Sequence, residues 1–111
     1  MIKVYLACPY SHADKSVREH RVEQVNKKAA ELMMSGYLVF SPLSHSHPIS
    51  KHCDVDPCDN GFWLRQDLWI LKFCDELHIL CIDGWKQSVG IKIEIKEAKN
   101  IGMEVVYHGD S

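Results

Sequence analysis

The segment from Ser88 to Glu94 has residue types and spacing that could hold an anion and place a carboxylate beside it. It follows an apolar run, Leu77–Ile82, which is typical of a buried strand. Ser88 is a good helix N-cap, and the small residues Ser88 and Gly90 allow a ligand to approach the backbone closely. A helix that begins at the carboxyl end of a strand binds anions in open α/β sheets. Glu94 would lie roughly 9 Å further along this helix, so one small substrate could contact both ends.

The same segment also has a strand pattern, because β-branched residues alternate from Val89 to Ile95. As a strand, it would place Glu94 on a polar face between two lysines. We favour the helix, because Ser88 supplies a start signal and Gly102 a stop signal. The helix also places Glu94 beside an apolar face, where a carboxylate needs an explanation.

Asp67 and Glu94 form a candidate carboxylate pair for breaking a glycosidic bond. In such a pair one group handles the proton or the leaving group, and the other attacks or stabilises the sugar cation. The chain has fifteen acidic residues, however, so ordinary surface or salt-bridged carboxylates are the default interpretation.

The histidines and cysteines in the middle of the chain offer a second chemistry, a zinc site. The candidate ligands are His45, His47, His52, Cys53 and Cys58. Their spacing lacks the paired Cys-x-x-Cys of common structural zinc sites. We therefore assign no metal ligand and favour a polar loop in which His45 or His47 contacts substrate.

Aromatic residues are also expected near the binding edge. Trp85 lies in the turn before the last helix and is a candidate wall of the pocket. Tyr10 follows the first strand and is placed to contact a ligand, whereas Tyr5 lies within that strand and should point inward. Trp63 and Trp69 have helical spacing and are more often core residues than base-stacking ones.

Alternating strands and helices must position these residues. The pattern predicts strands at Ile2–Ala7, Tyr37–Ser41, Asp75–Ile82 and Met103–Tyr107, and helices at about Asp14–Ser35, Phe62–Phe73 and Val89–Ile101. Leu43–Asn60 is predicted to be an irregular lid or substrate loop, in which a short helix would fit. Residues from Gly109 onward form a tail. The order predicts a parallel sheet with right-handed crossovers, in a flavodoxin-like or Rossmann-like three-layer α/β sandwich of four to five strands.

Composition and charge limit the function classes. With 111 residues, of which 46% are apolar and 25% charged, the chain is expected to form one globular domain over residues 1–111. The formal charge of -2 is not the excess of positive charge expected of a protein that binds duplex nucleic acid. No apolar run is long enough to span a membrane. No signal peptide precedes the first strand, so we expect a cytoplasmic protein with reduced cysteines.

Three motifs together resemble the nucleoside 2-deoxyribosyltransferase superfamily. They are Val4-Tyr5-Leu6-Ala7-Cys8-Pro9-Tyr10, then Arg65-Gln66-Asp67-Leu68 before Cys74-Asp75, then Ser88-x-Gly90-x-x-x-Glu94 with Ala98 and Gly102. They occur in the expected order over most of the chain. The segments Ser41–Pro48 and Asp83–Trp85 are most similar to an uncharacterised phage and bacterial branch.

The resemblance implies cleavage of the bond between a sugar and a base. It implies that Glu94 attacks or shields the anomeric carbon and that Asp67 lies near the base and the ribose. A serine at Ser88 is similar to the branch that hydrolyses nucleoside 5′-monophosphates, in which it holds the phosphate. Family members are usually dimers or larger, and the broad apolar surface of the second helix agrees with a subunit contact.

The main hypothesis from the sequence is therefore hydrolysis of a nucleoside 5′-monophosphate to release free base, without a cofactor. Glu94 and Asp67 are the catalytic candidates, and Ser88 holds phosphate with the amides of Val89 and Gly90. Further substrate contacts are expected from Tyr5, Tyr10, His45 and Trp85. Two alternatives remain open in addition to a zinc-dependent protein: a 2-deoxyribosyltransferase, and a nucleotide-binding sensor without turnover.

Overall fold

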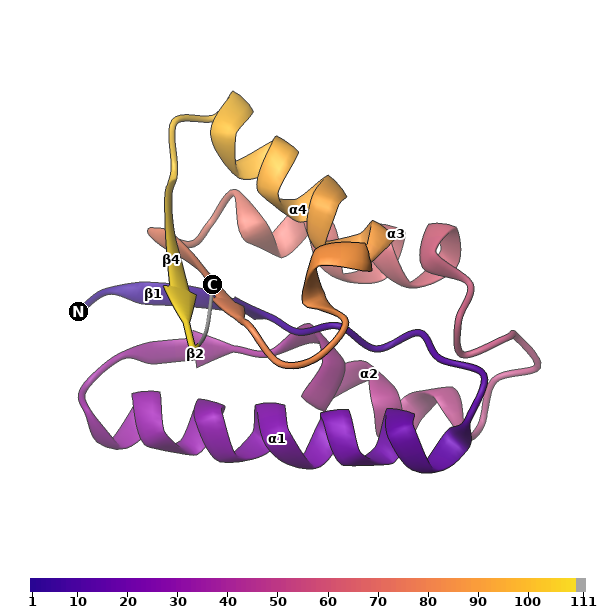
Figure 1. The fold of residues 1–111 in the computed structure, drawn as a ribbon. Helices are drawn as coiled ribbons and strands as arrows, with labels where there is room; N and C mark the ends of the chain where they lie inside the picture. The colour runs from indigo at the N-terminus through magenta and orange to yellow at the C-terminus, as the bar shows by residue number, and fades with distance from the viewer. Residues whose placement is uncertain (110–111) are drawn as a thin grey trace.

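The computed structural model describes residues 1–109, in which a parallel β-sheet lies between two layers of helices (Figure 1). The strands are β1 (Lys3–Ala7), β2 (Leu38–Phe40), β3 (Glu76–Leu80) and β4 (Glu104–His108). The α-helices are α1 (Lys15–Met34), α2 (Pro42–Ser50), α3 (Asn60–Leu71) and α4 (Val89–Asn100), and a short 3₁₀ helix, η1 (Trp85–Gln87), precedes α4. Asp110 and Ser111, part of the predicted tail, lie outside the described residues.

The four strands are all parallel and are arranged in the order β2-β1-β3-β4. In the centre of the sheet, Tyr5 of β1 is paired with Phe40 of β2 on one side and with Leu77 of β3 on the other. The predicted fold class, a flavodoxin-like or Rossmann-like sandwich around a parallel sheet, is confirmed. Because the strands point the same way, the loops after β1, β2 and β3 open at one edge of the sheet.

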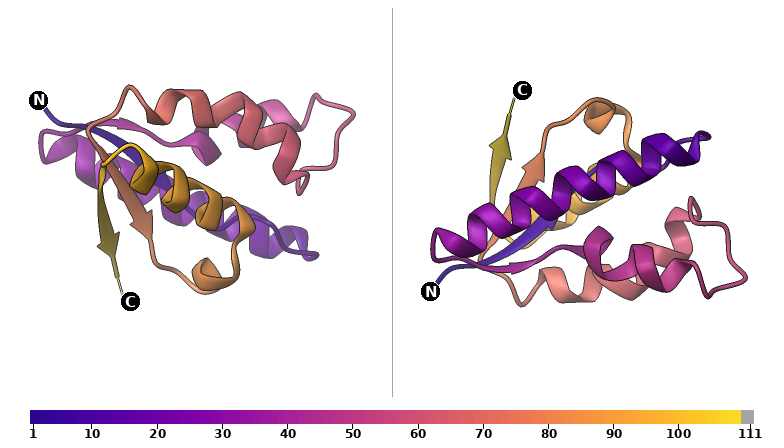
Figure 2. Two further views of the ribbon diagram at one scale, coloured as in Figure 1. Left: turned by 90° about the horizontal axis from the view of Figure 1, so that it is seen from above. Right: turned by 90° about the horizontal axis from the view of Figure 1, so that it is seen from below.

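The two faces of the sheet are covered by different helices. Val4 and Leu6 belong to the core under α1, whereas Tyr5 and Ala7 belong to the core under α3 and α4. This alternation follows from the two-residue period of a strand. Figure 2 shows α1 crossing one face of the sheet and α3 and α4 covering the other.

Helix α1 forms almost where the sequence predicts it. The Asp14 side chain caps its start by accepting a hydrogen bond from the backbone amide of Ser16 at 2.9 Å. One stripe of buried apolar side chains, at Val22, Val25, Ala29 and Leu32, holds the helix on the sheet.

The predicted lid loop contains a helix, α2, in its first half, as the sequence analysis allowed. Ser41 caps α2 by accepting from the amide of Ser44 at 3.3 Å, and Pro42 occupies the first turn, where its missing N–H costs nothing. The Ser-Pro pair is a helix start signal that the polar, histidine-rich composition of the segment obscured. Residues 51–59 are irregular and lead into α3, which begins after the Asp59 cap.

The helix interpretation of the segment after Ser88 is confirmed, and the strand interpretation is wrong. The Ser88 hydroxyl oxygen accepts a hydrogen bond from the amide of Ile91 at 3.2 Å and so caps α4. The buried residues of α4 are Ile91, Glu94 and Ala98, spaced three and four apart. One helical face therefore carries a carboxylate into the interior.

No helix within residues 1–109 is long and apolar enough to cross a membrane.

Candidate functional site

A cavity opens at the edge where the parallel strands end, between β1, α2, α3 and α4. The space inside it that a water molecule can occupy is about 100 Å³, and its mouth is open to solvent. The floor includes Tyr5, Asp67 and Glu94, and the mouth includes Tyr10 and Ser88. The predicted candidates from three distant parts of the chain are thus brought together.

Glu94 is buried in the floor of this cavity, with only 7% of its surface exposed. Burial raises the pKa of Glu94 to about 7; the nearby Tyr5 hydroxyl opposes the shift, and the charge of Asp67 adds to it. The carboxyl group can therefore gain or lose a proton near neutral pH. Such a poised group in a cavity is typical of a catalytic residue.

Tyr5 contributes a second buried polar group to the floor. Its side chain is fully buried, and its hydroxyl makes no well-aligned hydrogen bond to any residue in 1–109. Burial, together with the charge of Glu94, raises the pKa of Tyr5, so the hydroxyl keeps its proton. A proton donor is thus held beside Glu94, facing the cavity.

Asp67 is held in place by a hydroxyl that the sequence analysis missed. Ser46 of α2 donates to the Asp67 carboxylate, with its Oγ 2.9 Å from Oδ2 and 3.1 Å from Oδ1. Burial raises the pKa of Asp67, while the Ser46 hydrogen bond and the nearby His45 lower it. His45 Nδ1 lies 3.9 Å from Oδ1. Ser46 can be recognised as a residue of the site only once α2 is known to be a helix. It then lies on the same helical face as Ser50, which also lines the cavity.

The start of α4 forms one wall of the cavity mouth. Ser88 and Gly90 line the cavity, whereas the side chain of Val89 is exposed and does not. The first amides of a helix have no partner within it, so those of Val89 and Gly90 remain available for a ligand. A Cβ on Gly90 would lie 3.7 Å from Asn60 Oδ1 and 3.8 Å from Ser88 Oγ, which shows how closely α3 and α4 approach here.

The opposite wall of the mouth comes from the loop after β1 and from α2. The Tyr10 hydroxyl and His47 Nδ1 are 3.0 Å apart, and both side chains line the cavity. Of the two histidines proposed to contact substrate, His47 therefore lines the cavity. His45 is more than half exposed and reaches the site through Asp67.

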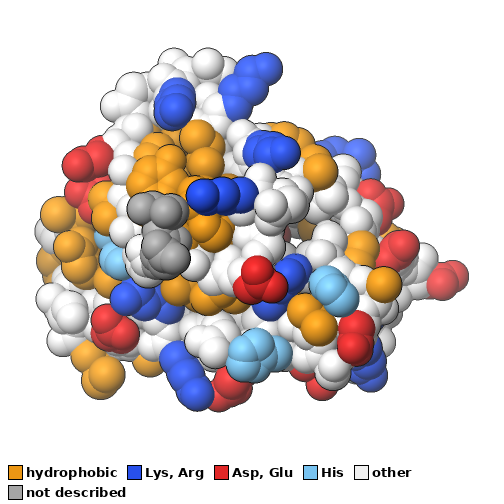
Figure 3. Space-filling model, viewed as in Figure 1, with side chains coloured by type: hydrophobic (Ala, Val, Ile, Leu, Met, Phe, Trp, Pro, Cys, Tyr) orange, Lys and Arg blue, Asp and Glu red, His pale blue; other side chains and the backbone are white. Residues whose placement is uncertain are grey.

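Trp85 does not line this cavity, which corrects the predicted pocket wall. Its ring packs against Tyr107 of β4, with centroids 5.6 Å apart, because η1 turns it toward the edge of the sheet. Figure 3 shows hydrophobic side chains gathered between β4 and α4 on the face seen in Figure 1. Trp85 thus belongs to the packing of this edge.

The histidine and cysteine segment does not assemble a zinc site. Within residues 1–109, no three His, Cys, Asp or Glu side chains are grouped in a way that could hold a metal ion. Residues 42–50 are helical and point Ser46 and His47 toward the cavity instead. The zinc alternative therefore has no ligand set in the described chain.

Cys8 lines the cavity beside these groups but is not an activated nucleophile. Burial raises the pKa of the Cys8 thiol to about 12, with Arg21 opposing the shift and Glu94 adding to it. The thiol therefore stays protonated at neutral pH, whereas the thiolate is the nucleophilic form of a cysteine.

Arg21 is a buried cation that the sequence analysis also missed. Its guanidinium donates to the carbonyl oxygens of Ser11 and Asp83, each at 3.1 Å, and so ties the loop after β1 to the loop after β3. Gly84 has a φ of +92°, and a Cβ there would lie 2.5 Å from Arg21 Nη2. The signal in the sequence was the spacing of four that places Arg21 on the same helical face as Val25.

The arrangement combines a poised carboxylic acid, a second carboxylate and a tyrosine hydroxyl inside one small pocket. Glu94 can attack or stabilise an electrophilic carbon, and Asp67 can orient a hydroxyl or an N–H group. The helix start at Ser88 can bind an oxygen-rich end of the same molecule.

The comparisons with known proteins agree with the fold. The structure is similar to that of a 2-deoxyribosyltransferase from the psychrotolerant bacterium Bacillus psychrosaccharolyticus, with a TM-score of 0.66 and 24% identity over 95% of this chain and 70% of that one. The fold implied by the resemblance in the sequence is therefore confirmed. No curated protein sequence matches the chain at a significant level. Residues 2–110 match the model of a family described as "Domain of unknown function (DUF1937)", and the chain belongs to this family.

Proposed function

We propose that the protein breaks the N-glycosidic bond of a nucleoside or nucleotide, with Glu94 as the nucleophile. The observation that supports this best is the placement of Glu94, buried in the cavity floor with its pKa raised to about 7, beside Asp67 and Tyr5. A buried carboxylate without a cationic partner is costly, and such a cost is typical of catalytic groups.

In the first step, a Glu94 oxygen attacks the anomeric carbon of the sugar, the bond to the base nitrogen breaks, and the leaving base takes up a proton from solvent. Asp67 orients the substrate or relays this proton. In the second step, another base or a water molecule attacks the same carbon and returns a proton to solvent, while the bond to Glu94 breaks and its carboxylate is released. The two acceptors distinguish a transferase from a hydrolase.

Transfer of a 2-deoxyribosyl group to a second base is the reading that the similar solved structure supports, because that protein is a 2-deoxyribosyltransferase. Hydrolysis of a nucleoside 5′-monophosphate is the second reading. It is supported by Ser88, whose hydroxyl and neighbouring amides at Val89 and Gly90 suit the 5′ end of the sugar, as a hydroxyl or a phosphate ester. Both readings use the same nucleophile and need no cofactor.

We also propose that the protein forms a homodimer or a larger homo-oligomer. Trp69 of α3 and Phe73, two residues beyond the end of that helix, are 59% and 60% exposed, which suits the subunit contact expected from the broad apolar surface. Light scattering of the wild type and of Trp69→Glu would test this; a monomeric wild type would contradict it.

The function is tested by supplying deoxyribonucleosides with and without a second base, and ribo- and deoxyribonucleoside 5′-monophosphates, and separating the products by chromatography. We expect base exchange or base release, and a loss of at least about a hundredfold in Glu94→Gln, or about 2.7 kcal/mol of barrier. Glu97→Gln is the matched control, because Glu97 lies on the exposed face of the same helix. If the wild type converts none of these substrates, the proposal is wrong and a binding protein without turnover takes its place.

A further inference from the structure

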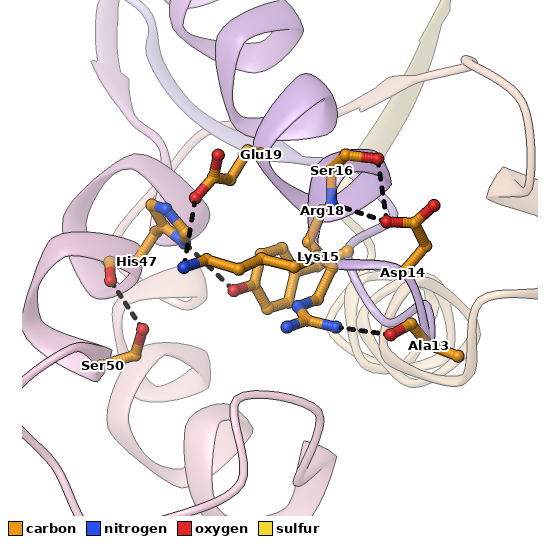
Figure 4. A network of polar contacts seen from close by, with 9 residues as sticks. Ala13, Asp14, Lys15, Ser16, Arg18, Glu19, His47 and Ser50 are labelled. Carbon is orange, nitrogen blue, oxygen red and sulfur yellow. Dashed lines mark hydrogen bonds and ion pairs between the residues drawn. The ribbon is translucent and has the colours of Figure 1, made fainter.

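A group of polar and cationic side chains lies at and beside one wall of the cavity mouth, and the proposed chemistry gives it no role. We call Tyr10, Arg18 and His47 the rim. Tyr10 belongs to the loop after β1. Figure 4 shows Arg18 at the start of α1 and His47 on α2. Tyr10 and His47 line the cavity, and Ser50, which donates to the carbonyl oxygen of His47 at 2.6 Å, lines it beside them.

Arg18 is a half-buried cation without a carboxylate partner. Its Nη1 donates to the carbonyl oxygens of His12 at 2.6 Å and Ala13 at 3.3 Å, and it forms no salt bridge with any acid in residues 1–109. These carbonyl bonds use one of its two terminal nitrogens. The other can still donate toward Tyr10, whose pKa is raised by burial and lowered by Arg18.

The charges around the rim are mainly positive. Lys15, Arg18 and Lys51 act on the His47 ring from α1 and from the end of α2, and Glu19 opposes them. Glu19 itself pairs with Lys15 at 3.9 Å. The first turn of α1 carries no acid, and the Asp14 carboxylate at its N-cap accepts hydrogen bonds from Ser16.

The pKa of His47 responds to these neighbouring charges. Burial lowers its pKa first, and the charges of Lys51, Arg18 and Lys15 lower it further, against the effect of Glu19. The imidazole is therefore neutral at neutral pH. It can offer an N–H to a ligand, and an anion placed beside it would raise its affinity for a proton.

We propose that the rim is an anion subsite that holds the phosphoryl group of a substrate whose remaining part occupies the cavity. The free terminal nitrogen of the Arg18 guanidinium supplies charge-assisted donors to such a group. The hydrogen-bonded pair of Tyr10 and His47 supplies one further proton when the imidazole is neutral, and two when it is protonated. The wall at Ser88 offers a hydroxyl and amides but no side-chain charge, so it can accept a neutral 5′-hydroxyl as well as a phosphate. The rim is thus the feature that would select a nucleotide over a nucleoside. The inference rests on the proposed function for the identity of the substrate.

The first test compares kcat/KM for a nucleoside 5′-monophosphate and its parent nucleoside. We expect Arg18→Gln to lower the preference for the nucleotide by at least about tenfold, because a charge-assisted contact with phosphate is lost. Arg18→Lys should restore part of the preference, and Arg65→Gln, the same change at an exposed position of α3, should leave it unchanged. Equal losses for both substrates, or a loss of preference only in Ser88→Ala, would overturn the inference and place the phosphate at α4.

The second test does not need turnover, so it separates this inference from the proposed function. Inorganic phosphate is added while the ring of His47 is titrated by NMR, its signal being identified by its loss in His47→Asn. We expect phosphate to shift the His47 midpoint to higher pH in the wild type and in Arg65→Gln, and not in Arg18→Gln. A midpoint that phosphate leaves unchanged in the wild type would overturn the anion subsite even if the protein cleaves nucleosides.

Discussion

Two clusters of buried titratable side chains lie on opposite faces of the same sheet, and they differ in how their polar atoms are satisfied. On the α1 side, His78 is 2% exposed, with Nε2 2.8 Å from Glu76 Oε1 and Nδ1 2.7 Å from His108 Nε2. One tautomer of His78 serves both contacts. On the other side, Glu94 and Tyr5 share a cavity, and the Tyr5 hydroxyl lacks an aligned partner within residues 1–109.

The difference separates a cluster that stabilises the fold from the one proposed to act on a ligand. Glu76, His78 and His108 bond one another, so their desolvation is compensated within the fold. Glu94 is buried beside another acid, and its pKa of about 7 shows that ionising its carboxyl group costs free energy in the folded protein. Buried groups left without partners in a cavity are the ones that a ligand can satisfy.

The largest effect is expected on stability, from Glu94→Gln above pH 7. Burial raises the pKa of Glu94 from 4.5 to about 7, so its charge costs nothing below about pH 4.5, increasingly destabilises the fold as the pH rises to 7, and costs about 3 kcal/mol above that. Urea unfolding should show the variant more stable than the wild type at pH 8, with the advantage gone at pH 4.5. The exposed Glu97→Gln should show no such gain, and a Glu94→Gln variant that is less stable at pH 8 would remove the contrast between the clusters.

The next effect is on activity as a function of pH. If ionised Glu94 is the nucleophile, kcat/KM should rise with an apparent pKa of about 7, because about a hundredth of the groups are ionised two units below it. Activity at pH 5 should then be about a hundredfold lower than the plateau. A profile that stays flat between pH 5 and pH 8 would argue against Glu94 as the titrating group.

Glu76→Gln should have the opposite consequences to Glu94→Gln. The change removes a charge-assisted hydrogen bond to a buried imidazole, so we expect a loss of about 2 kcal/mol of stability at pH 7. Base release or exchange should remain within about twofold of the wild type. A stable but inactive variant would show that the paired cluster also serves catalysis.

The smallest effect is expected from Ser46→Ala. It removes the hydroxyl that holds both Asp67 oxygens, raises the pKa of Asp67, and should lower kcat/KM by about tenfold. Ser46→Thr, which keeps a hydroxyl, should recover part of the activity. Ser44→Ala is the control on the same helix, since Ser44 bonds to Asn26 and Ser41 and does not line the cavity; an equal loss there would indicate a general effect on α2.

Much of the fold follows from local rules in the sequence. The capping residues Asp14 and Ser88 and the apolar stripes fix α1 and α4. Glu94 is a candidate from the sequence because helical spacing places this carboxylate beside an apolar face, and that spacing can be read without knowing the fold. The polar, histidine-rich composition of α2 hid its helical period, and with it the face that carries Ser46 and His47.

Contacts between distant segments could not be obtained in this way. Arg18 approaches Tyr10 and His47 only after α1 and α2 pack side by side, and Arg21 reaches Asp83 across 62 positions of the chain. Trp85 was expected in the pocket wall because it lies shortly before Ser88 in the sequence. That position does not determine the direction of its ring, which packs against Tyr107 in the structure. Spacing predicts which residues share an element, and tertiary packing decides which of them meet.

The cavity draws its lining from four separated stretches of chain, within residues 5–11, 42–50, 57–67 and 88–94. No single element of the fold contains the site, so a molecule that fits it binds the folded protein and not the unfolded chain. By mass action, such a molecule at a hundred times its Kd adds about 2.7 kcal/mol to the free energy of unfolding. For a chain of this size, that is a rise in Tm of about 10 °C or more. A rise in Tm can therefore identify which nucleosides and nucleotides in a library bind the protein, before any product has been detected.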